Sequence, residues 1–278
     1  MGVTRREPLP GDGLDVGKMP GHWLLARMGK RVLRPGGLES TRRLLHSLKI
    51  SSADTVVELA PGLGATARIA LLDRPASYVG VERDEAAVLA TQRILRPYSN
   101  AKYECRQGTA ERTGLEAAFA TVLYGEAMLT MQSSAQKREI VREAFRVLSP
   151  GGRYGIHELG LEPDDLEEAT KSRIMEELSA VIHVGARPQT VAEWAAILEE
   201  EGFLVRASFT APMRLLEPTR VVRDEGIRGA LRIVGNLLRN PVARRRVVAM
   251  RRLFRRHAKH LCAVTIVAEK PRADAASS

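Results

Sequence analysis

"VVELAPGLGATA", residues 56–67, combines an apolar run that ends in an acid, a proline, two glycines one residue apart, and small residues typical of a helix start. The backbone N–H groups of such a turn, and of the helix after it, can face a polar or anionic ligand. The segment therefore predicts a nucleotide-binding loop between a strand and a helix. The glycines alone do not show which nucleotide is bound.

The whole chain has the size and composition of a globular protein. It has 278 residues, of which 44% are apolar and only 4% aromatic. This length can bury a sizeable core, and so few aromatic side chains argue against a stacking surface for single-stranded nucleic acid. The first residues, "MGVTRREPLPGDG", lack the apolar centre of a signal peptide, and no apolar run reaches the roughly 18 residues of a membrane span. We expect a soluble, cytoplasmic protein, with peripheral membrane contact left open.

The two cysteines, Cys105 and Cys262, both fall in strand-like runs. We expect buried, reduced thiols on separate strands, too far apart to form a disulfide. The histidines and cysteines show no spacing typical of a metal site, so we expect no metal.

From residue 51 the chain alternates short β-branched runs with helical patterns. This alternation predicts βαβ units and a parallel sheet. The expected strands are residues 55–60, 78–83, 101–108, 119–128, 153–161, 203–213 and 260–270. One expected helix follows the glycine loop and ends near residue 73. The other expected helices cover residues 84–95, 133–148 and 190–203.

Two signals at the loop fit more than one nucleotide. "GLGATA" also satisfies a loose dinucleotide-binding pattern, and Glu82, 20 residues after Gly62, could hold ribose hydroxyls of either ligand. Glu58 does discriminate, because its carboxylate would repel a pyrophosphate but suits the amino group of a methionine moiety. The roughly 50 residues before the first strand leave room for a helical lid, and a "SPGG" turn separates the expected helix 133–148 from the fifth strand. These features favour S-adenosylmethionine.

The chain resembles the class I S-adenosylmethionine-dependent methyltransferases, in the small-molecule (type 11-like) branch that includes quinone-, sterol- and arsenite-type enzymes. The resemblance is carried by "VVELAPGLGAT", "YVGVERDEAAV", "RQGTAE" and "VLSPGGRYGIHE". It implies an α/β, Rossmann-like seven-stranded sheet of order 3-2-1-4-5-7-6, with strand 7 antiparallel, helices on both faces and a helical cap. The expected parts are a lid segment (1–50), a core (51–213 plus 260–271), a basic insert (214–259) and a disordered tail (272–278).

The resemblance also implies which residues bind S-adenosylmethionine. Ala60 stands where the family has its first motif glycine, and Thr109 stands where an acid often contacts the adenine. Both changes leave the expected contacts possible, because alanine is small and a hydroxyl accepts a hydrogen bond. The implied cofactor-binding residues are Glu58, Ala60, Gly62, Gly64, Glu82, Arg83, Thr109, Ala110, Tyr124 and Gly125.

Methyl transfer is an in-line displacement that depends mainly on alignment and the exclusion of water, so a base is not obligatory. His157, at the end of the fifth expected strand, is the first candidate for a base if one is used, with a purely structural role as the alternative. His183 is a weaker candidate. The stretch 21–37 is interpreted as a lid helix or as packing on the sheet edge. The candidate substrate residues are Trp23, Met28, Glu126 and Met128.

The segment from residue 220 to 259 is strongly basic, with 13 Lys/Arg and 2 Asp/Glu. Its apolar residues recur at helical spacing and predict two amphipathic helices, broken at Asn240-Pro241. Four interpretations stay open for it: a membrane-surface anchor for a lipid substrate, an RNA-binding patch, a lid for an acidic substrate, or a solvated cap.

We expect a methyltransferase for a small, lipid-like or quinone-like acceptor. The alternatives are an NAD(P)-dependent oxidoreductase, a nucleic-acid methyltransferase that uses the basic insert, and a cofactor-binding protein without turnover.

Overall fold

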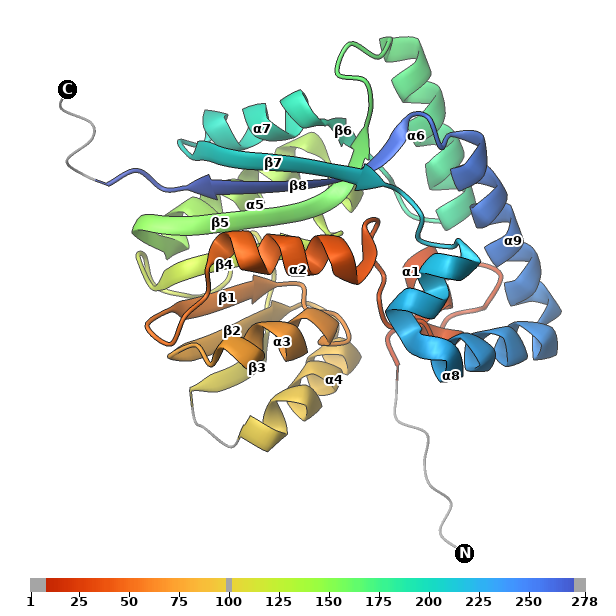
Figure 1. The fold of residues 1–278 in the computed structure, drawn as a ribbon, viewed down its shortest axis with the longest axis horizontal. Helices are drawn as coiled ribbons and strands as arrows, with labels where there is room; N and C mark the ends of the chain where they lie inside the picture. The colour runs from red at the N-terminus through yellow and green to blue at the C-terminus, as the bar shows by residue number, and fades with distance from the viewer. Residues whose placement is uncertain (1–8, 99–101, 273–278) are drawn as a thin grey trace, which may run out of the picture.

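The computed structural model describes residues 9–98 and 102–272. At its centre lies one twisted sheet of order β3-β2-β1-β4-β5-β8-β7, with the short β6 paired to β5 (Figure 1). β8 is antiparallel to β5 and β7, and the other pairs along the sheet are parallel. The predicted strand order is therefore confirmed, with the expected seventh strand now numbered β8. The strands are β1 (Thr55–Leu59), β2 (Ser77–Glu82), β3 (Tyr103–Gln107), β4 (Ala120–Glu126), β5 (Leu148–Leu161), β6 (Gln189–Thr190), β7 (Leu204–Pro212) and β8 (Leu261–Glu269).

Helices cover both faces of the sheet, as expected. Apolar side chains of α2, α3 and α4 pack on one face, and those of α5 and α7 pack on the other. Side-chain caps begin α4 at Asp84, α5 at Ser133 and α7 at Thr190. The helices are α1 (Gly21–Arg27), α2 (Gly37–Leu48), α3 (Ala65–Ala70), α4 (Glu85–Leu95), α5 (Ser134–Val147), α6 (Glu168–Ile182), α7 (Val191–Glu200), α8 (Pro218–Arg239) and α9 (Pro241–Arg256), with single 3₁₀ turns η1 (Leu71–Asp73), η2 (Arg96–Tyr98) and η3 (Leu129–Met131).

β5 begins five residues earlier than the sequence predicts. Leu148 pairs with Ala120, but the next pair joins Arg153 to Val122, so the "SPGG" residues form an irregularity within the strand. Gly151 has a φ of +78°, which a side chain would disfavour. The "SPGG" residues therefore belong to the first part of β5, and the expected turn between a helix and a strand is a corrected prediction.

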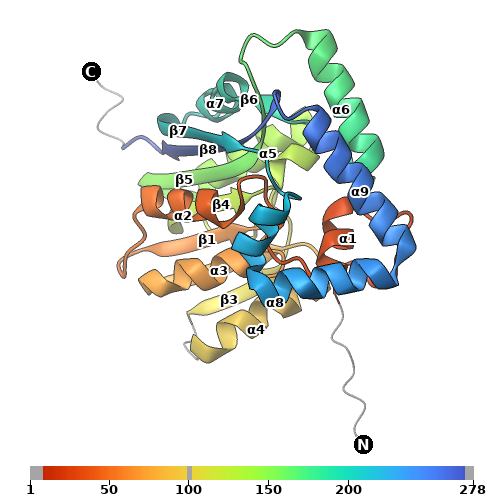
Figure 2. The ribbon, with the colours of Figure 1, turned by 45° about the vertical axis from the view of Figure 1, so that its right-hand side comes forward.

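A cap of α1, α6, α8 and α9 stands at one end of the sheet (Figure 2). These helices enclose an apolar core of their own, with Leu24, Leu178, Met250 and Phe254 among its members. Asn240 separates the two helices of the insert, and its side chain accepts a hydrogen bond from the Ala243 N–H at 3.0 Å. The predicted break between the two helices, at Asn240-Pro241, is therefore confirmed.

The insert is held to the N-terminal segment by two of its acids, Asp224 and Glu225. The Glu225 carboxylate accepts hydrogen bonds from the N–H groups of Arg31 and Val32, at 2.8 and 2.9 Å. Asp224 accepts one from the Leu38 N–H at 3.1 Å. The Lys30 ammonium lies 3.6 Å from the Glu225 carboxylate and is only 2% exposed. Burial lowers the pKa of Lys30, and the two neighbouring carboxylates oppose that effect.

Cys105 lies on β3 and Cys262 on β8, and both are buried free thiols, as predicted. Within residues 9–98 and 102–272, no helix has the length and apolarity needed to span a bilayer. The expected disordered tail falls almost wholly on residues 273–278, which lie outside the described residues.

We expect Glu225→Ala to lower the free energy of unfolding by about 3 kcal/mol, because it leaves the buried Lys30 without its nearer carboxylate and the N–H groups of Arg31 and Val32 without their acceptor. Urea unfolding followed by circular dichroism measures the change. Glu39→Gln is the matched control, since the Glu39 side chain is 67% exposed where it pairs with Arg220; it should cost less than about 1 kcal/mol. Equal losses in the two variants would contradict the role given to Glu225.

Candidate cofactor and acceptor site

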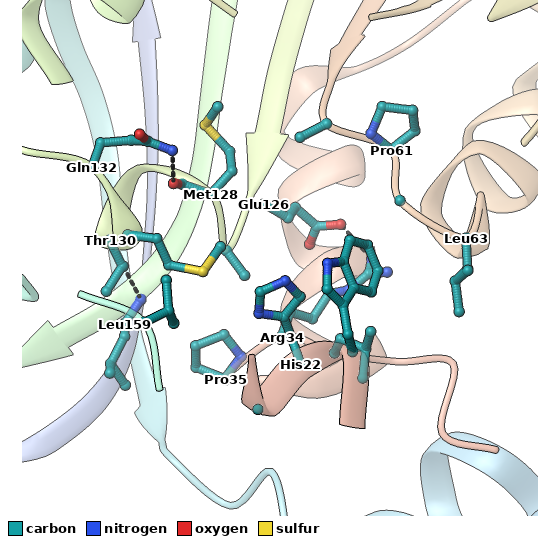
Figure 3. Close-up of a pocket in the computed structure, with 18 of the residues that line it drawn as sticks. His22, Arg34, Pro35, Pro61, Leu63, Glu126, Met128, Thr130, Gln132 and Leu159 are labelled. Atoms are coloured by element: carbon teal, nitrogen blue, oxygen red, sulfur yellow. Dashed lines mark hydrogen bonds and ion pairs between the residues drawn. The ribbon is translucent and has the colours of Figure 1, made fainter. Parts of the chain in front are cut away.

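A cavity of about 260 Å³ opens at the carboxyl ends of β1, β2 and β4, under the cap. Figure 3 shows Glu126 and Arg34 directed into it, between Pro61 and Leu63 on one side and Met128, Thr130 and Leu159 on the other. Ligands of open α/β sheets bind at this edge, where the loops after the strands converge. The cavity is therefore the candidate functional site.

The glycine loop forms one wall of this cavity through Ala60, Pro61, Gly62 and Leu63. Ala60, Gly62 and Gly64 all have positive φ, at 51°, 59° and 70°. Gly64 also lies against α4, where an added Cβ would approach Ile94 to 3.0 Å. The loop thus needs glycine at Gly64 for both conformation and space, whereas Ala60 holds its left-handed conformation at a cost.

Glu82, at the end of β2, is fixed by the loops around it. Its carboxylate accepts hydrogen bonds from the N–H groups of Gly62 at 3.0 Å, Arg83 at 2.7 Å and Asp84 at 3.0 Å. It also lines the cavity. A carboxylate held in this way is oriented before a ligand arrives, which lowers the entropic cost of binding a diol.

Glu58, near the end of β1, is a buried acid of which only one carboxylate oxygen accepts hydrogen bonds from described residues. The hydroxyls of Tyr78 and Tyr124 donate to its Oε2 at 2.6 and 2.9 Å. Among the described residues, no hydrogen bond reaches Oε1 of Glu58, whose side chain lines the cavity. Burial raises the pKa of Glu58 to about 7, against the two tyrosine hydrogen bonds. The site therefore offers a carboxylate that gains from a cationic partner.

Arg34 and Glu126 form a buried ion pair at the floor of the cavity. Arg34 Nη1 lies 2.5 Å from Glu126 Oε2, and both groups also contact the Thr66 hydroxyl of α3. The Thr41 hydroxyl of α2 donates to Glu126 Oε1 at 2.7 Å. Burial alone would raise the pKa of Glu126, but the Arg34 charge and the His157 hydrogen bond lower it to about 2. Glu126 is thus an anion at neutral pH and a very weak base.

His157 does not reach the cavity. Its side chain is 0% exposed, its Nε2 accepts a hydrogen bond from the Gly36 N–H at 3.1 Å, and its Nδ1 lies 2.7 Å from Glu126 Oε1. With Nε2 as acceptor, Nδ1 carries the proton and donates to Glu126. The prediction that His157 faces the acceptor as a base is wrong, because both nitrogens are used to position Glu126 and the lid segment.

The other predicted site residues divide into two groups. The cavity walls include the predicted Trp23, Arg83, Thr109, Ala110, Glu126 and Met128. Tyr124 and Gly125 do not line it: Tyr124 is fully buried and reaches the site only through its hydrogen bond to Glu58. Met28 is 5% exposed in the apolar core of the cap and is not among the residues that line the cavity, so its predicted contact with a substrate is also wrong. His183 ends α6 in a left-handed conformation, outside the cavity lining.

Comparison with known proteins identifies the family. Residues 56–152 match a family model described as a methyltransferase domain. A protein of Haemophilus influenzae, described only as uncharacterized, is 33% identical over 221 residues, which is 79% of this chain and 86% of that protein. The chain belongs to the class I S-adenosylmethionine-dependent methyltransferases. The resemblance inferred from its motifs is confirmed, and S-adenosylmethionine is the cofactor of the family.

Solved structures share the fold of this methyltransferase at low sequence identity. The [4+2]-cyclase SpnF superposes with a TM-score of 0.64 and 14% identity over 84% of this chain and 80% of that chain. A geranyl diphosphate methyltransferase bound to geranyl diphosphate and sinefungin superposes with a TM-score of 0.60 and 15% identity, over 84% of this chain and 77% of that chain. Phosphoethanolamine N-methyltransferase 2 of Haemonchus contortus, bound to S-adenosylmethionine, superposes with a TM-score of 0.67 and 14% identity, over 91% of this chain and 57% of that chain. Since one neighbour is a cyclase, the fold by itself does not name the reaction.

Sequence analysis missed His22 as a site residue of the methyltransferase. Its side chain lines the cavity, and no hydrogen bond joins it to another described residue. Burial and, second, the nearby Arg83 charge lower the pKa of His22 to about 4, so the imidazole is neutral at pH 7. Its position beside Trp23 in the expected lid helix was the available signal, but helix periodicity does not show which face meets a cavity.

The part of the cavity beyond the glycine loop is apolar. Apolar side chains from α1, α6, α9 and the segment after β7 converge there, and they outnumber the polar ones, which are those around Arg34 and Glu126 together with His22, Thr130 and Gln132. These apolar lining residues are Leu25, Leu33, Met131, Leu178, Ile182, Val184, Met213, Leu215, Met250 and Phe254. The methyltransferase thus encloses a chamber that suits an apolar molecule.

Replacing Ala60 with glycine should stabilise the methyltransferase by up to about 1 kcal/mol, because glycine adopts positive φ without the strain of a Cβ. Thermal unfolding measures this as a higher Tm. Ala249→Gly, at an exposed position inside α9, is the control and should lose about 1 kcal/mol. A lower Tm for Ala60→Gly would mean that the loop gains more from the methyl group than it loses in strain.

Proposed function

We propose that this methyltransferase transfers the methyl group of S-adenosylmethionine to an apolar, lipid-like small molecule held under the cap. The observation that carries the proposal is the chamber of apolar side chains from α1, α6 and α9, which adjoins the glycine loop. A polar or macromolecular acceptor would have to bury its own polar groups against this lining, at a cost of several kcal/mol.

In this proposal the glycine loop and the two strand-end acids hold the cofactor. Oε1 of Glu58 would accept a hydrogen bond from the amino group, and Glu82 would hold the ribose diol. Arg83, Thr109 and Ala110 would lie beside the adenine. The positive φ of Gly62, which lines the cavity and lets the backbone pass close to a ligand, supports this arrangement.

When bound, the cofactor supplies an electrophilic methyl group on a sulfonium. The chain contributes alignment of the acceptor and exclusion of water, which the cap and the apolar chamber provide. Glu126, with a pKa near 2, and His157, enclosed by its hydrogen bonds, are poor candidates for a base. The neutral His22 imidazole can accept a hydrogen bond from the acceptor and hold its nucleophilic atom in place. The site therefore suits a nucleophile that carries its lone pair at neutral pH.

Binding of S-adenosylhomocysteine should tighten as the pH rises through 7. The ammonium group needs the Glu58 carboxylate, which is mostly protonated below the pKa of about 7. Because only the ionised form binds well, affinity should fall about tenfold per pH unit below 7 and level off above it. Isothermal titration calorimetry between pH 6 and pH 8 measures this dependence.

Glu58→Gln should remove this pH dependence and bind more weakly than the parent at pH 8. Tyr124→Phe is the matched variant, since it removes one hydrogen bond to Glu58 and keeps the carboxylate. It should raise the pKa of Glu58 and move the binding curve to higher pH. A pH-independent affinity in the parent protein would contradict the role given to Glu58.

The acceptor class is tested with methyl-labelled S-adenosylmethionine. The enzyme is incubated separately with a total lipid and quinone extract, a water-soluble metabolite extract, and RNA. The proposal expects label in the lipid and quinone extract. Leu215→Gln, which makes the chamber polar, should raise the KM for that acceptor at least several-fold and leave cofactor affinity unchanged.

Label in RNA or only in water-soluble products would overturn the acceptor class but not the methyltransferase. Glu58→Gln serves as the control for cofactor-dependent turnover. Binding of S-adenosylhomocysteine without any labelled product from the three pools would instead favour a protein that uses the cofactor fold without methyl transfer.

A further inference from the structure

α8 leaves a stripe of large apolar side chains in solvent. Leu231 is 66% exposed, and its neighbours along the helix are exposed to a similar degree. Their spacing of four, three and four residues places them on one face of the helix. The α8 stripe consists of Ile227 (69% exposed), Leu231 (66%), Val234 (52%) and Leu238 (62%). The sequence predicted this periodicity, but the structure turns the stripe outward.

The opposite face of α8 is already occupied by the lid segment. Ile233 is 8% exposed, and the Asn236 side chain donates to the Met28 carbonyl at 3.0 Å. Gly229 is buried on the same face. The helix therefore cannot bury its apolar stripe by rotating, because that would expose the face that docks onto the protein.

The stripe is accompanied by unpaired positive charge. From Gly226 to Lys259 the sequence has 11 Lys/Arg and no Asp or Glu. Several exposed arginines of α8 and α9 form no ion pair or hydrogen bond with another described residue. These unpaired arginines are Arg228, Arg239, Arg244, Arg245 and Arg252.

We propose that the α8 stripe and these arginines dock the protein onto the surface of an anionic lipid bilayer, with α8 lying in the interface. An exposed apolar stripe flanked by arginines is the pattern of helices that insert shallowly between lipid headgroups. Anionic headgroups complement the unpaired arginines, and the acyl boundary takes up the four apolar side chains. This inference rests on α8 and α9 and does not depend on the proposed function.

Other occupants fit the surface less well. A second copy of the chain packed stripe to stripe would bring two arginine-rich helices together without a neutralising acid. Nucleic acid would match the arginines but would leave the apolar stripe in water, since phosphates give it no partner. An anionic bilayer satisfies both features together.

The bilayer position has a consequence for the cap. α9 carries the exposed Arg252 on its outer side and Met250 and Phe254 in the lining of the chamber. Figure 2 shows α8 and α9 joined at a corner beside α1. Docking would thus hold the helices that enclose the chamber against the surface where apolar molecules reside.

Sedimentation with vesicles tests the proposal. The full chain should bind vesicles of phosphatidylcholine with phosphatidylglycerol at least several-fold more than vesicles of phosphatidylcholine alone. Binding should weaken as salt rises from about 0.1 M to 1 M, where the Debye length falls from about 10 Å to 3 Å. The double substitution Ile227→Ser/Leu231→Ser should lower binding about tenfold, and Arg228→Gln/Arg239→Gln should lower both the binding and its salt dependence.

Leu72→Ser is the matched control, because Leu72 is 71% exposed on η1, outside the insert. It should bind vesicles like the parent, and all variants should keep the parent Tm. Equal binding to neutral and anionic vesicles would overturn the proposal. A loss of vesicle binding in Leu72→Ser as large as that in Ile227→Ser/Leu231→Ser would also overturn it. So would light scattering that shows a dimer dissociated by Ile227→Ser/Leu231→Ser, or RNA binding that competes with the vesicles.

Discussion

The buried ion pair between Arg34 and Glu126 is the contact on which the site depends. Arg34 belongs to the lid segment and Glu126 ends β4, so the pair joins the N-terminal segment to the sheet. Thr66 of α3 and Thr41 of α2 complete the hydrogen bonding around it. A buried charge without its partner costs several kcal/mol, so the lid, the helix after the glycine loop and the centre of the sheet are coupled in one arrangement.

The same network explains why two histidines have different roles. His157 lies under the lid segment, where the Gly36 amide and the Glu126 carboxylate use both its nitrogens. His22 lies on the cavity side of the lid and is neutral because burial lowers its pKa. The position of each histidine relative to Arg34 and Glu126 decides which of the two imidazoles can contact a ligand.

The charged side chains of the insert are also sorted by burial: the acids that are buried have hydrogen-bonding partners, and most of the arginines are exposed. Two of its acids, Asp224 and Glu225, are buried against the N-terminal segment, where they accept hydrogen bonds from backbone N–H groups and face Lys30. Its arginines lie mostly on the outside, some paired to Glu177 and Glu217. The positive excess of the segment is therefore concentrated on the surface of the cap, together with the apolar stripe of α8.

The sequence by itself determined the alternation of strands and helices and the nucleotide loop, because β-branched runs, glycines with positive φ and capping residues act through local geometry. The strand order followed only from the resemblance to the methyltransferase family. It also placed Glu58 and Glu82 at strand ends, and Gly62 in the loop, where all three line the cavity. Only the tertiary structure decided that His157, Tyr124 and Met28 lie outside the cavity lining, that His22 belongs to it, and that the α8 stripe faces solvent. Periodicity shows which residues share a face, but the direction of that face depends on what packs against it, and contacts between segments 100 or more residues apart, such as Gly36 with His157, leave no local pattern.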